Sequence, residues 1–131
     1  FMKNLTIERV LNNKKDSPTV IQGQRHCLWF DTRYNKQKLN GMGIPTEPID
    51  KADDKLLEKE GEEALHSSIK EAKENAQTDE EKAIARYREV REMRRIVERT
   101  HKEVIQEMKD LNFDYYDHNP RPLVSVPNFE P

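Results

Sequence analysis

Apolar residues recur at seven-residue intervals through the second half of the chain, and this spacing predicts one long helix with an apolar seam. The seam residues are Ala83, Val90, Val97, Val104 and Leu111, with Tyr87, Arg94, His101 and Met108 at the alternate positions. Thr78 and Glu81 have the spacing of a capping box, so the helix should begin there. Arg94 and His101 occupy positions that a strong coiled coil gives to apolar residues, which lowers stability but fixes the register.

A second helical pattern precedes this one, between about residues 50 and 75. Its stripe consists of Leu57, Gly61, Leu65, Ile69, Ala72 and Ala76. Gly61 weakens such a helix by about 1 kcal/mol relative to alanine, and it either marks a break or lets a neighbouring element approach closely, which is the commoner reason. The connection at residues 75–78 is short, and short connections place consecutive helices antiparallel. We therefore predict a coiled-coil-like antiparallel hairpin over residues 49–113.

Residues 2–48 predict a small N-terminal unit of a different texture. Apolar residues at helical spacing within residues 4–14 indicate one short helix. From Pro18 to Tyr34 the chain is rich in β-branched and aromatic residues on both sides of Gly23, which predicts a β-hairpin of two short strands. Glycines and prolines between residues 36 and 48 then predict a loop.

The last segment, residues 114–131, contains four prolines among apolar side chains and is predicted to be extended. Its residues Pro120, Arg121, Pro122 and Leu123 have the character of an extended ligand, because proline reduces the entropy lost on binding. The segment could equally wrap its own helices. The fold class expected from the whole pattern is mainly α: a long antiparallel two-helix hairpin with a small N-terminal β-hairpin segment and an extended, proline-rich C-terminal tail.

The composition indicates that the chain buries a narrow apolar seam and not a large hydrophobic core. Hydrophobic residues make up 34% of the chain against 37% charged residues, with a mean hydropathy of -1.07, whereas soluble domains usually hold about 45–50% apolar residues. The formal net charge is only -2, so the chain as a whole attracts neither nucleic acid nor an anionic membrane. A single cysteine and no apolar run near the ~20 residues of a membrane span predict a soluble, intracellular protein, cytoplasmic or nuclear.

Opposite charges gather in the two predicted helices. Residues 50–63 hold seven acidic and three basic side chains, and residues 86–102 hold seven basic and three acidic ones. Folding about residue 77 would lay these stretches side by side, so the charges favour the intramolecular pairing. One alternative is a basic stripe that follows the phosphates of a nucleic acid, formed by Arg88, Arg91, Arg95, Arg99 and Lys102. The other is that the same arginines bind a protein.

Catalytic and metal chemistry have little support in the pattern. His26 and Cys27 are adjacent and Asp31 is close in sequence, but neighbours on a strand point to opposite faces, so a hydrolase or transferase built on them is not expected. The four histidines and the cysteine lack the spacing of a zinc site, so we predict neither a metal nor another cofactor.

These observations predict a non-enzymatic protein–protein interaction module, a small adaptor or structural component of a larger assembly. It would bind a protein partner or self-associate, because two helices alone leave part of each apolar face uncovered. The expected contact residues are Trp29, Phe30 and Tyr34, the seam residues Tyr87, Arg94 and His101, and the tail residues Pro120, Arg121, Pro122 and Leu123. A nucleic-acid-associated protein that uses the basic stripe is the alternative.

Overall fold

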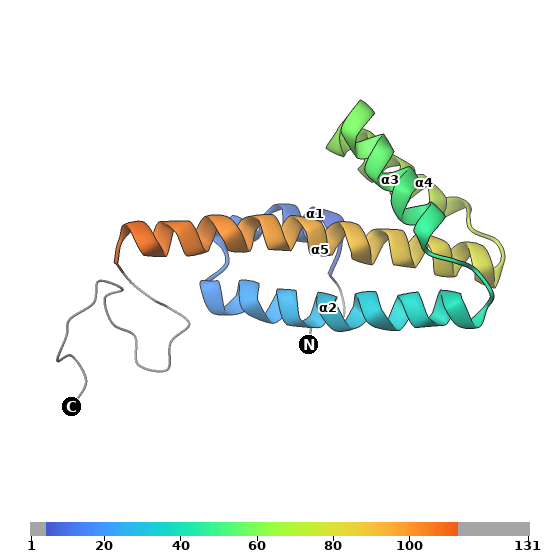
Figure 1. The fold of residues 1–131 in the computed structure, drawn as a ribbon. Coiled ribbons are helices and arrows are strands. Elements are labelled where there is room, and N and C mark those ends of the chain that lie inside the picture. The colour runs from blue at the N-terminus through green and yellow to red at the C-terminus, as the bar shows by residue number, and fades with distance from the viewer. Residues whose placement is uncertain (1–4, 113–131) are drawn as a thin grey trace.

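The computed structural model describes residues 5–112 and shows a mainly helical protein (Figure 1). Its elements are α1 (Ile7–Leu11), a short 3-10 helix (Asn13–Lys15), α2 (Pro18–Gly41), α3 (Glu47–Glu60), α4 (Glu62–Asn75) and α5 (Asp79–Asp110). No β-strand occurs in this part of the chain. None of the helices described there is both long and apolar enough to cross a membrane.

Helix α5 is the central element, and it begins where the sequence predicts. The Thr78 hydroxyl oxygen accepts a hydrogen bond from the Glu81 backbone N–H at 3.1 Å, and the Glu81 carboxylate accepts one from the Thr78 N–H at 3.1 Å. The predicted capping box is confirmed. With 32 residues, α5 is about 48 Å long, so every other helix can pack along it.

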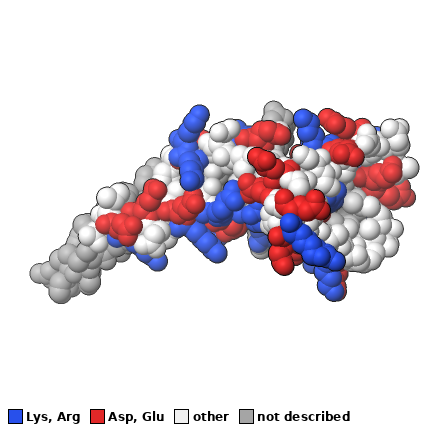
Figure 2. Space-filling model, turned by 90° about the horizontal axis from the view of Figure 1, so that it is seen from above, with Lys and Arg blue, Asp and Glu red and all other residues white. Residues whose placement is uncertain are grey.

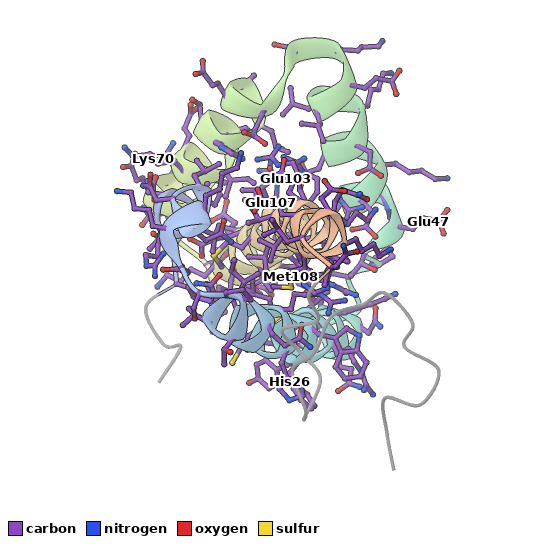
Figure 3. All side chains as sticks on the ribbon, turned by 90° about the vertical axis from the view of Figure 1, so that its left-hand side faces the viewer. His26, Glu47, Lys70, Glu103, Glu107 and Met108 are labelled. Carbon is purple, nitrogen blue, oxygen red and sulfur yellow. The ribbon has the colours of Figure 1, made fainter. Side chains whose placement is uncertain are left out.

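Helix α2 runs antiparallel to α5 along much of its length (Figure 1). In the view along α5, α2 lies on one side and the pair α3–α4 forms an arch on the other (Figure 3). The main core contains buried residues from α1, α2, α4 and α5: Ile7, Val10, Ile21, Leu28, Leu65, Ile69, Val90, Met93, Ile96 and Val97. The predicted seam of α5 is only partly buried. Arg94, His101 and Val104 are half-buried and Leu111 is 76% exposed, and the buried members are Ala83, Tyr87, Val90, Val97 and Met108.

The predicted N-terminal β-hairpin is wrong, because residues 18–41 form the single helix α2. Ser17 caps this helix by accepting a hydrogen bond from the Val20 N–H at 3.2 Å, and proline at the first position fits the helical backbone. Its buried side chains are Ile21, Gln24, Leu28, Asn35 and Leu39, at helical spacing. The helix also continues through the first part of the predicted loop and ends at Gly41.

The segment expected as one helix from about residue 50 to residue 75 is two helices, α3 and α4. Gly61 separates them with φ 95° and ψ 172°, a conformation that is essentially restricted to glycine. The chain therefore reverses within a single residue. The glycine serves as a break and not as a point of close helix approach. As a result, α2 and not this segment is the longer neighbour of α5 (Figure 1).

Candidate interaction surface

The arginines of the basic stripe point at the carboxylates of α3 and α4. Arg88 and Asp53 form an ion pair at 2.9 Å, with side-chain exposures of only 15% and 8%. Arg91 pairs with Asp50 and Asp54, each at 3.1 Å. These contacts confirm the predicted pairing of the acidic stretch with the basic one. Acidic and basic side chains are accordingly interleaved on this face of the molecule (Figure 2).

A partly buried cluster of Glu62, His66 and Glu92 has the composition of a metal site, and its ligand atoms lie within 4.8 Å of one another. Arg95 already occupies the centre of the cluster, since its guanidinium donates to Glu92 at 2.8 and 2.6 Å and to Glu62 at 2.6 Å. His66 Nε2 lies 2.6 Å from Glu92 Oε2. A divalent cation would face the Arg95 guanidinium, and Arg95 and Arg99 together already balance the charges of both carboxylates, so the geometry fits an ion-pair network better than a metal site.

The same network determines the ionisation of Glu62. Burial opposes its negative charge, but hydrogen bonds from Arg95 and Arg99 outweigh burial and hold the pKa of Glu62 below its usual range. Arg95 and Arg99 approach it at 2.6 and 2.8 Å. With Arg88 and Arg91, four of the five residues of the basic stripe are therefore held by carboxylates of the same chain, and Lys102 is exposed.

The side of α2 that faces away from α5 carries aromatic side chains that are exposed to solvent. Trp29, Phe30 and Tyr34 are 41%, 52% and 64% exposed. His26 is exposed as well and points away from α5 (Figure 3). Together with Arg33 these residues form what we call the aromatic face of α2. Positions 26, 29, 30, 33 and 34 recur at spacings of three and four, so one side of the helix carries them all.

The aromatic face is ordered by contacts among its own side chains. The rings of His26 and Phe30 meet edge to face with centroids 4.9 Å apart, and those of Trp29 and Phe30 do so at 5.2 Å. The Arg33 guanidinium lies 4.9 Å from the Trp29 ring centroid. Such aromatic and cation–π contacts are worth about 0.5–1.5 kcal/mol each, enough to favour one arrangement of the rings before any ligand binds.

A cleft of about 250 Å³ adjoins this face where α2 meets α5. It is lined by Gln22, Arg25, His26, Trp29, Arg94 and Glu98. An ion pair between Arg25 Nε and Glu98 Oε2 at 3.0 Å joins the two helices there. The structure thus brings together Trp29 and Arg94, two residues that the sequence selected for unrelated reasons. Burial, followed by the positive charge of Arg25, lowers the pKa of His101 in the same region.

The remaining candidate residues lie elsewhere. Tyr87 is only 2% exposed and donates a hydrogen bond to Asp50 at 2.8 Å, and burial is the main cause that raises its pKa to about 12. It therefore joins α3 to α5 inside the protein and is not available to a partner. Pro120, Arg121, Pro122 and Leu123 lie outside the described residues.

The surroundings of Cys27 disfavour its thiolate form. Burial, and then the negative charge of Asp31, raise the pKa of the Cys27 thiol. A reactive cysteine needs the opposite shift, because the thiolate is the nucleophile. His26 is engaged edge to face with Phe30.

Comparison of the chain with protein-family models, with curated proteins and with solved structures gives no match.

Proposed function

We propose that this protein is a non-enzymatic protein–protein interaction module, a small adaptor or structural component of a larger assembly, and that it binds its partner through the aromatic face of α2. The observation that carries the proposal is the exposure of Trp29, Phe30 and Tyr34 on one side of a helix whose other side already fills the core. A surface helix normally places charged and polar residues there.

The energy available from covering this face is large for so small an area. Aromatic side chains bury about 150–250 Å² each, and roughly half of that remains uncovered here. At about 25 cal/mol per Å², covering it yields on the order of 2–3 kcal/mol per ring before the entropic cost of association. Tryptophan, tyrosine and arginine are also the residue types that dominate binding energy at protein interfaces, and the aromatic face contains all three.

The rest of the fold supports this role as a scaffold. Helix α5 is held from one side by α2 and from the other by the ion pairs of Arg88, Arg91, Arg95 and Arg99 with α3 and α4. Those ion pairs also weaken the nucleic-acid alternative, since phosphates would have to compete with carboxylates already in place. A backbone so held presents the aromatic side chains without a large loss of conformational entropy on binding.

The proposal is tested by affinity capture of the full chain from the cells that make it, comparing three forms. Phe30→Ala with Tyr34→Ala removes two rings while keeping good helix formers on α2. Lys55→Ala with Glu58→Ala is the matched control, because both residues are exposed on α3 and the net charge is unchanged. We expect recovery of the stoichiometric partner to fall at least tenfold for the first variant, which corresponds to about 1.4 kcal/mol, and to stay unchanged for the second.

Equal recovery of the same partner from the wild type and both variants would overturn the proposal. Circular dichroism of each variant shows whether the helices are intact. Partner recovery that instead disappears with moderate salt or nuclease treatment, while the aromatic variant behaves like the wild type, would favour the nucleic-acid alternative.

A further inference from the structure

We propose that residues 113–131 of the same chain dock on the aromatic face of α2, so that a partner must displace them. The inference concerns regulation of the surface described above and rests on the proposed function for its biological meaning. The intramolecular contact can nevertheless be measured without any partner. Three independent features support it: the geometry of the α2–α5 pair, the chemistry of the segment and the charges of the two surfaces.

The antiparallel pairing of α2 and α5 sets the distance between Asn112, the residue before the segment, and Trp29 on the aromatic face. The ion pair of Arg25 with Glu98 fixes which residues of α2 and α5 lie opposite each other. At 1.5 Å per residue, Asn112 lies about 21 Å beyond Glu98, and Trp29 lies about 6 Å from Arg25 in the opposite direction. Allowing roughly 10 Å for crossing the width of a helix, the path from Asn112 to Trp29 is on the order of 30 Å.

An extended chain that starts at residue 113 is long enough to bring the proline-containing residues to the aromatic face. At about 3.1–3.3 Å per residue, roughly nine residues span 30 Å, which brings positions 120–123 opposite Trp29. The remaining residues are sufficient to continue past Tyr34, which lies about 8 Å further along α2.

The chemistry of the segment matches that of the face. Extended proline-rich segments bind to surfaces lined by aromatic rings, since proline is already close to the bound conformation and loses little entropy. In the proposed contact, Pro120 and Pro122 would lie opposite the exposed rings and the cleft beside Trp29. The residues that follow supply further apolar side chains: Leu123, Val124, Val126 and Phe129. The exposed rings therefore meet apolar and ring-bearing residues along the whole path.

The charges are complementary as well. Besides Arg25, which is paired with Glu98, helix α2 carries three basic side chains (Arg33, Lys36 and Lys38) against one acidic side chain (Asp31). Residues 113–131 carry three acidic side chains (Asp114, Asp117 and Glu130) against one basic side chain (Arg121). A second copy of α2 would bring like charges together, so face-to-face self-association is disfavoured. Because the segment is covalently attached, its effective concentration is in the millimolar range and even weak affinity suffices.

Trp29 provides a direct measurement, since it is the only tryptophan in the chain. We would compare acrylamide quenching and the emission maximum of Trp29 in three full-length proteins at low micromolar concentration. These are the wild type, a variant with Pro122→Ser, Leu123→Ser and Val124→Ser, and a control with Asn119→Ser and Asn128→Ser. We expect the quenching constant to rise about twofold with a red-shifted emission in the first variant, because the ring regains contact with water, and to stay unchanged in the control.

Equal quenching in all three proteins would overturn the proposal. The proposed function would be unaffected by that result, because the capture experiment with the Phe30 and Tyr34 variant tests it separately. Protection of Trp29 that disappears on dilution, with a dimer seen by light scattering, would overturn the intramolecular contact in favour of exchange of the segment between two copies. A single-stranded oligonucleotide could also be added as a quencher of Trp29 fluorescence. If it quenched the wild type and the Pro122 variant equally, the intramolecular contact would be overturned in favour of nucleic acid on the basic, aromatic side of α2.

Discussion

Replacing Leu28 with alanine is expected to lower the free energy of unfolding by about 3 kcal/mol, within the 2–5 kcal/mol typical of large-to-small changes in a packed core. The Leu28 side chain has no exposed surface and lies in the main core between α2 and α5. The matched control is Phe30→Ala, two residues away. Because Phe30 is 52% exposed, its loss should cost only about 1 kcal/mol, which comes mainly from its ring contacts with His26 and Trp29. Urea denaturation followed by circular dichroism measures both values.

The comparison also distinguishes the helix from the strand that the sequence suggested. On a strand, residues 28 and 30 share a face, so both substitutions would cost similar amounts. On a helix they are about 200° apart, so one is buried while the other faces solvent. Similar losses of stability for Leu28→Ala and Phe30→Ala would therefore contradict the packing of α2 on α5 described above.

Replacing Asp53 with alanine should lower the free energy of unfolding by about 3 kcal/mol, because it leaves the nearly buried Arg88 guanidinium without its carboxylate. The Asp53 side chain is 8% exposed and that of Arg88 15%, and Arg88 Nε donates to both carboxylate oxygens at 3.1 Å. The matched control is Asp54→Ala, which removes the neighbouring carboxylate that pairs with Arg91. The Asp54 side chain is 63% exposed, and ion pairs of that kind contribute about 0–1 kcal/mol.

Chemical denaturation at low and moderate salt measures both aspartate variants. Salt should reduce the small effect of Asp54→Ala further, and should leave most of the effect of Asp53→Ala, because buried pairs are screened much less than exposed ones. A loss for Asp53→Ala no larger than that for Asp54→Ala would show that the pairing of α3 with α5 contributes little to stability.

The elements that could be predicted from sequence are those whose signals lie close together in the chain. The capping box at Thr78 spans four residues, and both of its hydrogen bonds are present. The seven-residue repeat of α5 needs no knowledge of its neighbours, because one stripe of a long helix is enough to show the period. The pairing of the acidic and basic stretches was predicted from the fold about residue 77 together with the opposite charges of the two stretches.

Helix α2 was mistaken for two strands because it is apolar on two sides. Leu28 is buried against α5 while Trp29 and Phe30 face solvent, so consecutive positions are apolar and the helical period disappears from the sequence. Aromatic residues also favour strands locally. The cap at Ser17 and Pro18 was the available signal, because it is a favourable start for a helix. The positions that obscure the helical period, Trp29 and Phe30, belong to the proposed interaction surface.

The candidate site could be predicted in part. Trp29, Phe30 and Tyr34 stand out in a chain poor in apolar residues, and they are exposed together. The partners that order them, His26 and Arg33, become apparent only once the segment is helical. Two other features depend on tertiary contacts and were not accessible: the burial of Tyr87 against Asp50, and the cluster of Glu62, His66 and Glu92 drawn from two helices.

The central claim, that the aromatic face of α2 binds a protein, is tested most directly by photo-crosslinking in the cells that make the full chain. A photoreactive phenylalanine analogue at position 34 would lie on the exposed side of α2, and the same analogue at position 58 would lie on the exposed surface of α3. We predict a discrete adduct of higher mass, containing one recurring protein, from position 34 and not from position 58. No intermolecular adduct at position 34, or the same adducts at both positions, would contradict the claim.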